Sequence, residues 1–396
     1  VAAADHLDAD NCREVLWKKH DVSLLAKIPN ARLVKDFRPI AVLPVIYKLY
    51  SRVMYMLAEN TCDRLYAPQF AFRKFHQAHE VVFIMRQHIE KAVEWKTPSL
   101  FIMDGDIKEA YDYASPTLFA EAARNRGMHE VLIHAWLREW RSMKSVFKLD
   151  AQTTSKEVER TRSFPQGDLA APMIFNLVLY TLAETFINTA VGKGWGKRLQ
   201  DASWENLILF AANYWLVATS ADMLNLMTRE WLRLLEGVGW ETPSEELSWC
   251  TTVDDEVEYV ITVDYKRVRR PKRGEGFNAL GTIITFDNNF DVEIENRIAR
   301  ANVKFNANWS MLGCDSAPSA KRVHIFRVTV EASFLWCAGS WNLRLEQLKR
   351  IKGAQSRMMR RMLRIKRWNG EEMEDLIIRA SSVLKLRLRD TAIKHV

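Results

Sequence analysis

The stretch Phe101-Ile102-Met103-Asp104-Gly105-Asp106-Ile107-Lys108-Glu109-Ala110-Tyr111-Asp112 decides the predicted fold. Its first residues are apolar and predict a short buried strand that ends at Asp106. Ser115-Pro116 then predicts the start of a helix that Gly127 ends. A carboxylate that leaves a buried strand, with the aromatic Tyr111 five residues later, is suited to hold a divalent metal ion beside a nucleotide. An Asp at this place can also simply cap a strand, so the function depends on motifs farther along the chain.

Length and composition indicate a globular protein with substantial cores. The chain has 396 residues, of which 48% are hydrophobic, and this is enough for two or three domains. Its cysteines are far apart and form no Cys-x-x-Cys pair, which argues against a zinc ribbon or a disulfide framework. The longest apolar run, around Ala171 to Ala183, is interrupted by Asn176 and is too short to span a bilayer. With no secretory signal at its start, we expect an intracellular protein, nuclear or cytoplasmic, without a membrane partner.

The net charge of +8 is concentrated near the C-terminal end of the sequence. Between Arg344 and Arg367 there are ten Lys and Arg residues and a single acid, Glu346. A local positive field of this kind suits a polyphosphate partner. Four of these cations share one broad face of a helix: Arg350, Arg357, Arg361 and Arg364. Apolar side chains can pack inward from the opposite face: Leu348, Ile351, Met359, Met362 and Leu363. We therefore predict that 344–367 is a helix that contacts nucleic acid.

Two further segments belong to the predicted site. Residues 165–172, which read Pro-Gln-Gly-Asp-Leu-Ala-Ala-Pro, form a loop before a long apolar helix over about 172–190. Such a loop can present backbone N–H groups to a ligand, or it can be a plain start of a helix. Residues 207–218 predict a strand over Leu207–Phe210, a tight turn at Ala211-Ala212-Asn213-Tyr214 and a second strand over Trp215–Ala218. From Val292 onward the pattern predicts helices over 292–312, 319–337, 344–367 and 371–389.

Six blocks, in this order, resemble those of the reverse transcriptase domain of non-LTR, LINE-type retrotransposons. The blocks are Arg38-Pro39-Ile40, Gln69-Phe70-Ala71-Phe72-Arg73, Asp106 to Asp112, Gln166 to Pro172, Phe210-Ala211-Ala212-Asn213 and Ala279-Leu280-Gly281. The resemblance covers about Lys27 to Arg367. Group II intron maturases are a less close match.

The resemblance implies an α+β fold with the architecture of a right hand. Such a hand has fingers, a palm built on a small antiparallel sheet that carries Asp106 and the Ala212 turn, and a helical thumb. The expected parts are an N-terminal extension (1–19), fingers (20–100), palm (101–285), thumb (286–370) and a C-terminal helical tail (371–396).

The resemblance also implies an RNA-directed DNA polymerase. In this chemistry, carboxylates hold two Mg²⁺ ions that activate the primer hydroxyl and neutralise the departing pyrophosphate. Asp106 would supply one carboxylate, and Tyr111 would lie under the sugar of a deoxynucleoside triphosphate, where it can exclude a 2′-hydroxyl. The implied partners are an RNA template and a DNA primer, or an RNA–DNA duplex.

Further positions follow from the same resemblance. Arg38, Lys35 and Arg73 would lie near the incoming triphosphate, although each can also be a solvated surface charge. Gln166 and Gly167 would line the nucleotide and template side of the site.

The catalytic turn departs from the family. Phe-Ala-Asp-Asp is replaced by a turn that has Ala212 and Asn213 where the family has its remaining metal ligands. Alanine cannot bind a metal ion, and asparagine offers a neutral oxygen. A metal clamp contributes several kcal/mol to the transition state, so this loss is expected to slow polymerisation by roughly three orders of magnitude or more. In addition, Glu245 and Glu246 stand where the family has a Lys that can protonate pyrophosphate.

Three interpretations remain open. The chain is an active reverse transcriptase with a substitute metal ligand, an impaired domain that keeps its nucleic-acid cleft, or a non-catalytic scaffold with a basic face. The substitutions favour the second interpretation, with weak Mg²⁺ binding. The separation of Asp106 from residues 212–213 in the structure tests the predicted palm.

Overall fold

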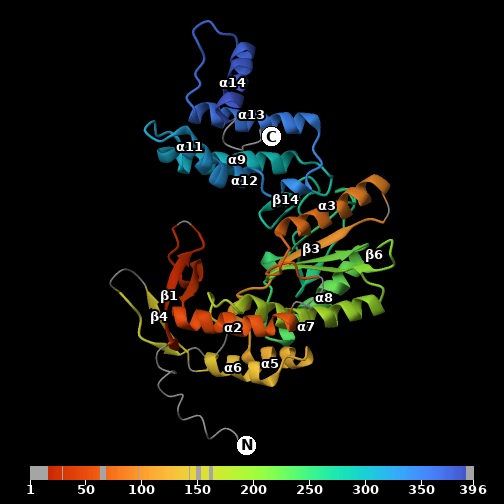
Figure 1. Cartoon of the computed structure of the whole chain (residues 1–396). Helices are drawn as coiled ribbons and strands as arrows, with labels where there is room; N and C mark the ends of the chain where they lie inside the picture. Colours follow the sequence, from red (N-terminus) through yellow and green to blue (C-terminus); the bar gives the residue numbers. More distant parts are fainter. Residues whose placement is uncertain are drawn as a thin grey trace, which may run out of the picture. The chain divides into compact units, whose positions relative to one another are not determined.

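The computed structural model describes residues 17–388, except positions 29, 63–67, 97, 142, 149–152 and 160–163. Figure 1 shows the elements along the chain. The chain divides into two compact units. Unit 1 consists of residues 1–76, 101–248 and 259–269, and unit 2 consists of residues 77–100, 249–258 and 270–396. Each unit is a part of the chain whose residues contact mainly one another. The predicted bounds of fingers, palm and thumb stay a prediction. The α+β class is confirmed, because helices accompany several small, mostly antiparallel sheets.

The central sheet of unit 1 contains the segment that ends at Asp106. Three of the four strands of this sheet, β3 (Phe101–Asp106), β9 (Asn213–Ala218) and β8 (Leu207–Phe210), pair antiparallel in the order β3-β9-β8. Their residues are buried almost continuously, because helix α8 (Ala221–Gly237) packs against β3 and β9. Gly105 is required here, because a Cβ atom at this position would overlap the ring of Tyr214 on the paired strand.

The long apolar helix α7 (Ala171–Gly192) lies in the core of unit 1. It confirms the predicted helix over about 172–190, although its 22 residues exceed the apolar run seen in the sequence. The expectation that this segment is too short to span a bilayer is therefore wrong for the helix. Among the described residues it is the one helix long and apolar enough to cross a membrane, and 56% of its apolar window is buried inside the protein. A single helix of this kind says little about membranes, because core helices pass the same test.

A second sheet of unit 1 has the strand order β2-β1-β4-β5. Its strands are β1 (Lys19–Ala26), β2 (Phe37–Val42), β4 (Lys144–Lys148) and β5 (Val158–Glu159). Helices α2 (Val45–Cys62), α5 (Pro116–Asn125) and α6 (Glu130–Trp140) accompany it in sequence. The predicted cap of α5 is confirmed, because the Ser115 hydroxyl accepts a hydrogen bond of 3.2 Å from the backbone N–H of Thr117. The remaining short elements of unit 1 are η2 (Val34–Asp36), α4 (Ala110–Tyr113), β6 (Lys197–Arg198), β7 (Trp204–Glu205), η3 (Ser244–Glu246), β11 (Thr262–Val263) and β12 (Lys266–Arg267). Strand β10 (Ser248–Thr251) begins at the last residue of this part of unit 1 and otherwise belongs to unit 2.

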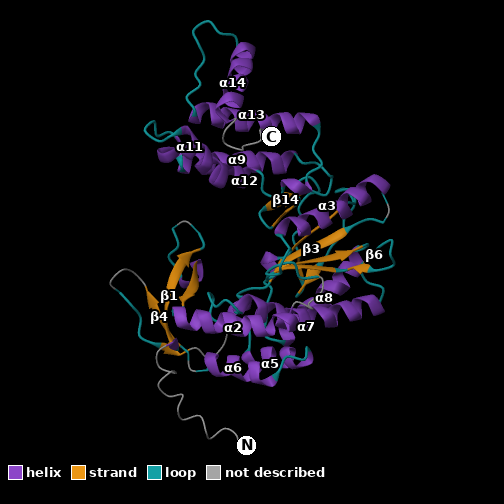
Figure 2. Ribbon diagram, in the orientation of Figure 1, coloured by secondary structure: helices purple, strands orange, loops and turns teal. Residues whose placement is uncertain are grey.

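Unit 2 is mainly helical, as Figure 2 shows for its C-terminal part. Its elements are α3 (Ala78–Trp95), the hairpin β13 (Phe277–Ala279) and β14 (Thr282–Ile284), α9 (Asp291–Ala307), α10 (Trp309–Leu312), α11 (Ser319–Phe326), the π-helix η4 (Arg327–Glu331), α12 (Ala332–Phe334), η5 (Ala338–Ser340), α13 (Leu345–Met362) and α14 (Met373–Leu388). Its core contains apolar side chains of α9, α11 and α13, among them Ile294, Phe326 and Met359. The helix predicted over 344–367 ends at Met362, because Arg364 adopts a left-handed backbone with a φ of 54°.

A buried ion pair joins α9 to the β13–β14 hairpin. Arg297 Nε lies 2.7 Å from Glu293 Oε1, and both side chains are almost fully buried. Glu293 also accepts a 2.7 Å hydrogen bond from the backbone N–H of Ile283, and Arg297 donates to the carbonyl of Gly281. Because both charges are paired and bonded to the hairpin backbone, their burial is compensated.

Candidate functional site

The structure brings the two ends of the predicted catalytic strands together. Asp106 at the end of β3 lies directly opposite Asn213 at the start of β9. The backbone N–H of Ile107 donates a 3.0 Å hydrogen bond to the carbonyl of Ala212. The predicted adjacency of Asp106 and residues 212–213 is therefore confirmed, while the catalytic roles of these residues stay a prediction.

The tight turn between β8 and β9 places Ala211 in the left-handed region, with a φ of 53°. This conformation is uncommon for residues other than glycine. A two-residue hairpin turn of this kind matches the twist of its flanking strands when a central residue has positive φ. The turn therefore needs support from its surroundings to hold Ala211 in this conformation.

Gln69 supplies that support. Its side chain is 1% exposed. Its Oε1 accepts hydrogen bonds from the backbone N–H of Ala211 (2.9 Å) and of Ala71 (3.0 Å), and its Nε2 donates to the carbonyl of Ala211 (3.2 Å). Beside it, the backbone N–H of Phe70 donates a 3.0 Å hydrogen bond to the carbonyl of Leu209. Gln69 thus fixes the turn to the block that follows α2. It opens a block that the sequence singles out, but no sequence signal pairs it with a residue 142 positions away.

A cavity of about 990 Å³ opens in front of Asp106 and the turn, entirely within unit 1. Its lining includes most of the predicted site residues: Asp106, Tyr111, Gln166, Gly167, Arg38, Ala212 and Asn213. Lys27, Phe72 and Pro172 line it as well. Its volume is in the range of pockets that hold small-molecule ligands of nucleotide size.

Tyr111 belongs to α4 and lines the same cavity as Asp106. Its ring stacks on Phe175, with centroids 4.6 Å apart and an interplanar angle of 21°. The ring is half-buried, and burial raises the pKa of its hydroxyl above the ordinary value. The Tyr111 ring is thus held by stacking on Phe175 and borders the cavity, as expected for a residue that would lie under a sugar.

The loop before α7 is held in place by contacts with α2 and with Ala41. Asp168 is buried and accepts hydrogen bonds from the Tyr47 hydroxyl (2.8 Å) and the Ser51 hydroxyl, both on α2. Gly167 has a φ of 122°, and a Cβ atom there would overlap the carbonyl oxygen of Ala41. A side chain at position 167 would therefore be strained and would clash. These contacts place Gln166 and Gly167 at the cavity wall.

The carboxylates near the turn are electrostatically unfavourable. The pKa of Asp106 is raised to about 6, mainly by burial and in part by the charge of Glu246, while Arg38 opposes the shift. Burial raises the pKa of Asp104, which is on the same strand, to about 7. Glu246 on η3 thus adds a repulsive charge near Asp106, in a segment where the resembling family has a Lys.

The residues at the turn do not fit a two-metal centre. Asp106 is the one carboxylate at the turn, because positions 212 and 213 carry Ala and Asn. Across the described part of the chain, no group of three or more His, Cys, Asp and Glu side chains is arranged to hold a metal ion. Two Mg²⁺ ions need several oxygen ligands with negative charge, and this site supplies too few.

The cations predicted to lie near the triphosphate differ in position. Arg38 is exposed and lines the cavity. Arg73 does not line it, and its Nη1 donates a 2.9 Å hydrogen bond to the carbonyl of Gln69. The backbone of Lys35 is in η2, but its side chain lies outside the described residues.

The four arginines predicted to contact nucleic acid lie in unit 2 and do not line the cavity. Three of them have local partners: Arg350 binds Asp291 and Glu295 at 2.8 Å each, Arg361 stacks on Trp309 at 4.4 Å, and Arg364 binds Asp315 at 2.7 Å. Arg357 makes no ion pair with any described residue. The inward face is confirmed, because Ile351, Met359, Met362 and Leu363 are buried and Leu348 is partly buried. Contact with nucleic acid stays a prediction.

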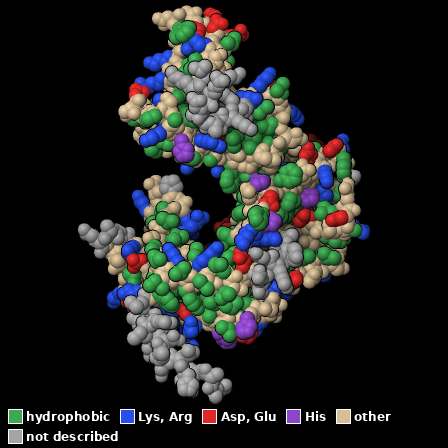
Figure 3. Space-filling model, in the orientation of Figure 1, with side chains coloured by type: hydrophobic (Ala, Val, Ile, Leu, Met, Phe, Trp, Pro, Cys, Tyr) green, Lys and Arg blue, Asp and Glu red, His purple; other side chains and the backbone are tan. Residues whose placement is uncertain are grey.

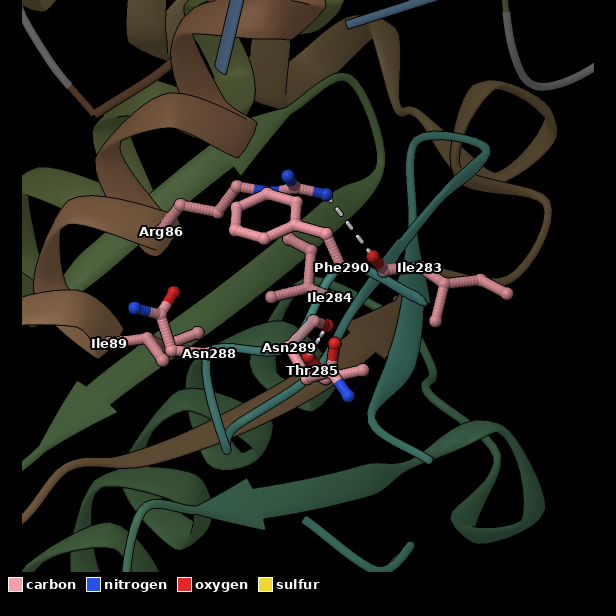
Figure 4. A pocket seen from close by; sticks show the side chains of 8 residues that line it. All are labelled: Arg86, Ile89, Ile283, Ile284, Thr285, Asn288, Asn289 and Phe290. Carbon is pink, nitrogen blue, oxygen red and sulfur yellow. Dashed lines mark hydrogen bonds between the residues drawn. The ribbon is translucent and has the colours of Figure 1, made fainter. Parts of the chain in front are cut away.

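A small cavity within unit 2 is formed by packing. Figure 4 shows the Arg86 guanidinium over the ring of Phe290, at 4.4 Å from its centroid, and its hydrogen bond of 3.3 Å to the carbonyl of Ile283. The volume of about 10 Å³ is enough for a water molecule and too small for a substrate. Burial lowers the pKa of Arg86 to about 10.

One family model and several solved structures match this chain. The family model described as reverse transcriptase (RNA-dependent DNA polymerase) matches residues 18–260. Among solved structures, apo telomerase from Candida tropicalis is similar with a TM-score of 0.46, 11% identity, and coverage of 91% of this chain and 69% of that chain. A telomerase from Candida albicans in complex with the TWJ fragment of telomeric RNA is similar with a TM-score of 0.43 and 12% identity. That match covers 94% of this chain and 62% of that chain.

A truncated Candida tropicalis telomerase gives a TM-score of 0.43 at 11% identity, and the match covers 59% of this chain and 50% of that one. The chain thus spans between half and about two thirds of the telomerase chains it matches. No curated protein matches. Because the family model matches more than half of its residues, the chain belongs to the reverse transcriptase (RNA-dependent DNA polymerase) family.

Proposed function

We propose that this chain is a reverse transcriptase-like domain of LINE-type origin that binds primer–template nucleic acid but has lost most of its polymerase activity. The six ordered sequence blocks support the LINE-type origin. The observation that carries the loss of activity is the pairing of Asp106 with Asn213, next to Ala212. This position holds one carboxylate where the family holds several.

The protonation of Asp106 bears on the same conclusion. With a pKa raised to about 6 by burial and by Glu246, Asp106 stays protonated to a higher pH than an ordinary carboxyl group. A proton competes with a metal ion for the carboxylate oxygens, so the one carboxylate at the turn is lost as a ligand below about pH 6. Polymerisation would need several kcal/mol of transition-state stabilisation from groups that are not present, and each ~1.4 kcal/mol corresponds to a tenfold change in rate.

The binding function rests on the part of the cavity that is intact. Arg38 and Lys27 offer positive charge for phosphates, Gln166 offers an amide, and Tyr111 offers a ring face for a sugar or base. The exposed cations of the 344–367 stretch add charge for a nucleic-acid backbone. RNA template, DNA primer and deoxynucleoside triphosphates are the ligands that these groups suit.

Two measurements on the unchanged chain separate the three interpretations. Fluorescence anisotropy with an RNA–DNA primer–template, repeated over a range of salt, is expected to show binding that weakens as salt increases. Primer extension with Mg²⁺ and all four deoxynucleoside triphosphates is expected to show no product above background. Extension at an ordinary polymerase rate would contradict the loss of activity and favour a substitute ligand. Absence of duplex binding would leave a scaffold without a nucleic-acid cleft.

A further inference from the structure

The block that follows α2 holds two phenylalanines in the left-handed region of the backbone. Phe72 has a φ of 59° and Phe75 a φ of 64°. This conformation is strained for residues with a bulky side chain. Both rings are nevertheless exposed, Phe72 to 53% and Phe75 to 97%. Phe72 lines the cavity in front of Asp106, and Phe75 follows it by three residues. Neither ring obtains the burial that would compensate for such strain.

Exposure alone does not identify a binding site. Figure 3 shows hydrophobic side chains gathered over α2 as well, and apolar residues are common on protein surfaces. Phe75 differs because of its place in a turn. The backbone N–H of His76 donates a 3.4 Å hydrogen bond to the carbonyl of Arg73, and Phe75 is the third residue of the turn that this bond closes. Glycine or asparagine is favoured there when φ is positive. The stability of the chain therefore does not account for a phenylalanine at position 75.

Two helices hold the backbone that carries these rings. Asn176 Nδ2 on α7 donates a buried 2.8 Å hydrogen bond to the carbonyl of Ala71. Lys74 Nζ lies 2.5 Å from Glu59 Oε1 on α2. The rings thus project from a backbone that is already held in place. A ligand that stacks on them would not have to order this backbone, which lowers the entropic cost of binding.

An exposed ring beside a cavity of nucleotide size suits an unpaired base. Aromatic side chains bind single strands by stacking on their bases, with little dependence on sequence. Bases inside a duplex are already stacked on their neighbours. Three residues span at most roughly 11 Å, and successive bases of a helical strand are about 3.4 Å apart. Phe72 and Phe75 are therefore within reach of one short stretch of strand. In a primer–template, the unpaired bases are those of the template beyond the primer end.

We infer that Phe75 stacks on an unpaired template base, next to the nucleotide that would occupy the cavity beside Phe72. The inference rests on the proposed function, because it requires a primer–template at this cavity. RNA and DNA templates should be bound alike, because stacking uses the face of the base and not the sugar. A phenylalanine in a turn that favours glycine is then explained by binding, since its ring lowers stability and contributes affinity.

Fluorescence anisotropy with three forms of one primer–template tests this inference. The first is blunt, the second has a single-stranded template overhang, and the third has the same overhang without its bases. The unchanged chain should bind the second form most tightly, because an abasic overhang keeps the phosphates and offers nothing to stack on. Phe75→Ala should weaken binding of the second form by roughly tenfold and leave the other two unchanged. Tyr265→Ala is the matched control, because Tyr265 is fully exposed with a φ of 61° but does not line the cavity.

Phe75→Gly separates a binding role from a structural one. Glycine adopts positive φ without strain. The urea midpoint of this variant should therefore equal or exceed that of the unchanged chain, while its affinity for the overhang falls as in Phe75→Ala. A lower midpoint would show that the ring supports the fold and would overturn the inference.

Binding of the blunt form separates the inference from the proposed function. Equal affinity of the unchanged chain for the blunt form and for the overhang with bases would overturn the inference alone, because duplex binding would still be present. Equal weakening of both overhangs by Phe75→Ala would also overturn it, since position 75 would then act through the strand backbone. No binding of any form would overturn the inference together with the proposed function.

Discussion

At the scale of single residues, the site is defined by groups that hold the turn and by groups that are missing from it. Gln69 binds both the N–H and the carbonyl of Ala211. Asp106 remains at its strand end, but burial and Glu246 disfavour its charge. The backbone of the turn is thus held in place, while positions 212 and 213 carry Ala and Asn and supply no further carboxylate.

Gln69→Ala should destabilise the turn between β8 and β9 and leave the packing of the apolar core unchanged. It removes three hydrogen bonds and leaves buried backbone groups of Ala211 and Ala71 unsatisfied, so the free energy of unfolding should fall by about 1–3 kcal/mol. Urea denaturation measures this change, and hydrogen exchange should become faster at the Ala211 amide. Gln87→Ala, at a half-buried position on α3, is the control and should change stability by less than about 0.5 kcal/mol. Equal effects of the two substitutions would show that Gln69 has no special role.

Asp104 gives a prediction about pH. Its pKa is raised from 3.8 to about 7 by burial, so the folded state binds this proton more tightly than the unfolded state does. The free energy of unfolding should therefore fall as pH rises from about 4 through about 7. Asp104→Asn removes this contribution, so the variant should lose less stability than the unchanged chain between about pH 5 and about pH 8. Thermal denaturation at several pH values measures the difference, with Asp264→Asn, at an exposed turn, as the control. Parallel pH profiles of Asp104→Asn and the unchanged chain would contradict the assignment.

At the scale of elements, α13 shows both the reach and the limit of sequence periodicity. The repeat of apolar residues correctly predicted its inward face, because that pattern is local. It did not predict the end of the helix at Met362, which depends on the left-handed backbone of Arg364. It also did not predict the acids on α9 and the loop after α10 that bind Arg350 and Arg364. These partners are far away in sequence, and no periodic pattern encodes them.

The arginines of this region should still contribute to duplex binding. Changing Arg357, Arg361 and Arg364 to Ala together should weaken binding to an RNA–DNA duplex. It should also reduce the salt dependence by roughly one unit of slope for each phosphate that the protein no longer neutralises. Anisotropy titrations at several salt concentrations measure the slope. Arg233→Ala on α8, where Arg233 binds Glu230 at 2.7 Å, is the control and should not alter it. An unchanged slope in the triple variant would show that this face is only solvated.

At the scale of the whole molecule, the fold and the grouping of the site residues were predicted mainly from the order of the six sequence blocks. The strand that ends at Asp106, the tight turn after Phe210 and the helix from about Pro172 were each predicted from local pattern, and the structure places them around one cavity. The turn is shorter than predicted, because the second strand already begins at Asn213. The sequence did not predict the clamp at Gln69 or the exposed apolar side chains of α2. Both depend on which surface a side chain meets after folding. An apolar stripe on a helix indicates burial, but the sequence does not say whether the chain itself supplies the cover.

The most direct test of the account is the rate of primer extension after repair of the turn. Ala212→Asp restores a carboxylate beside Asp106, and the matched control Ala211→Asp places one at the neighbouring turn position, next to Gln69. We predict no extension by the unchanged chain or by Ala211→Asp, and slow extension by Ala212→Asp. Asn213→Asp should restore less, because Asn already offers an oxygen. Adding Glu246→Lys to Ala212→Asp should increase the rate, since general-acid help typically contributes roughly 10²–10⁴-fold. Extension by the unchanged chain at the rate of the Ala212→Asp variant would contradict the account.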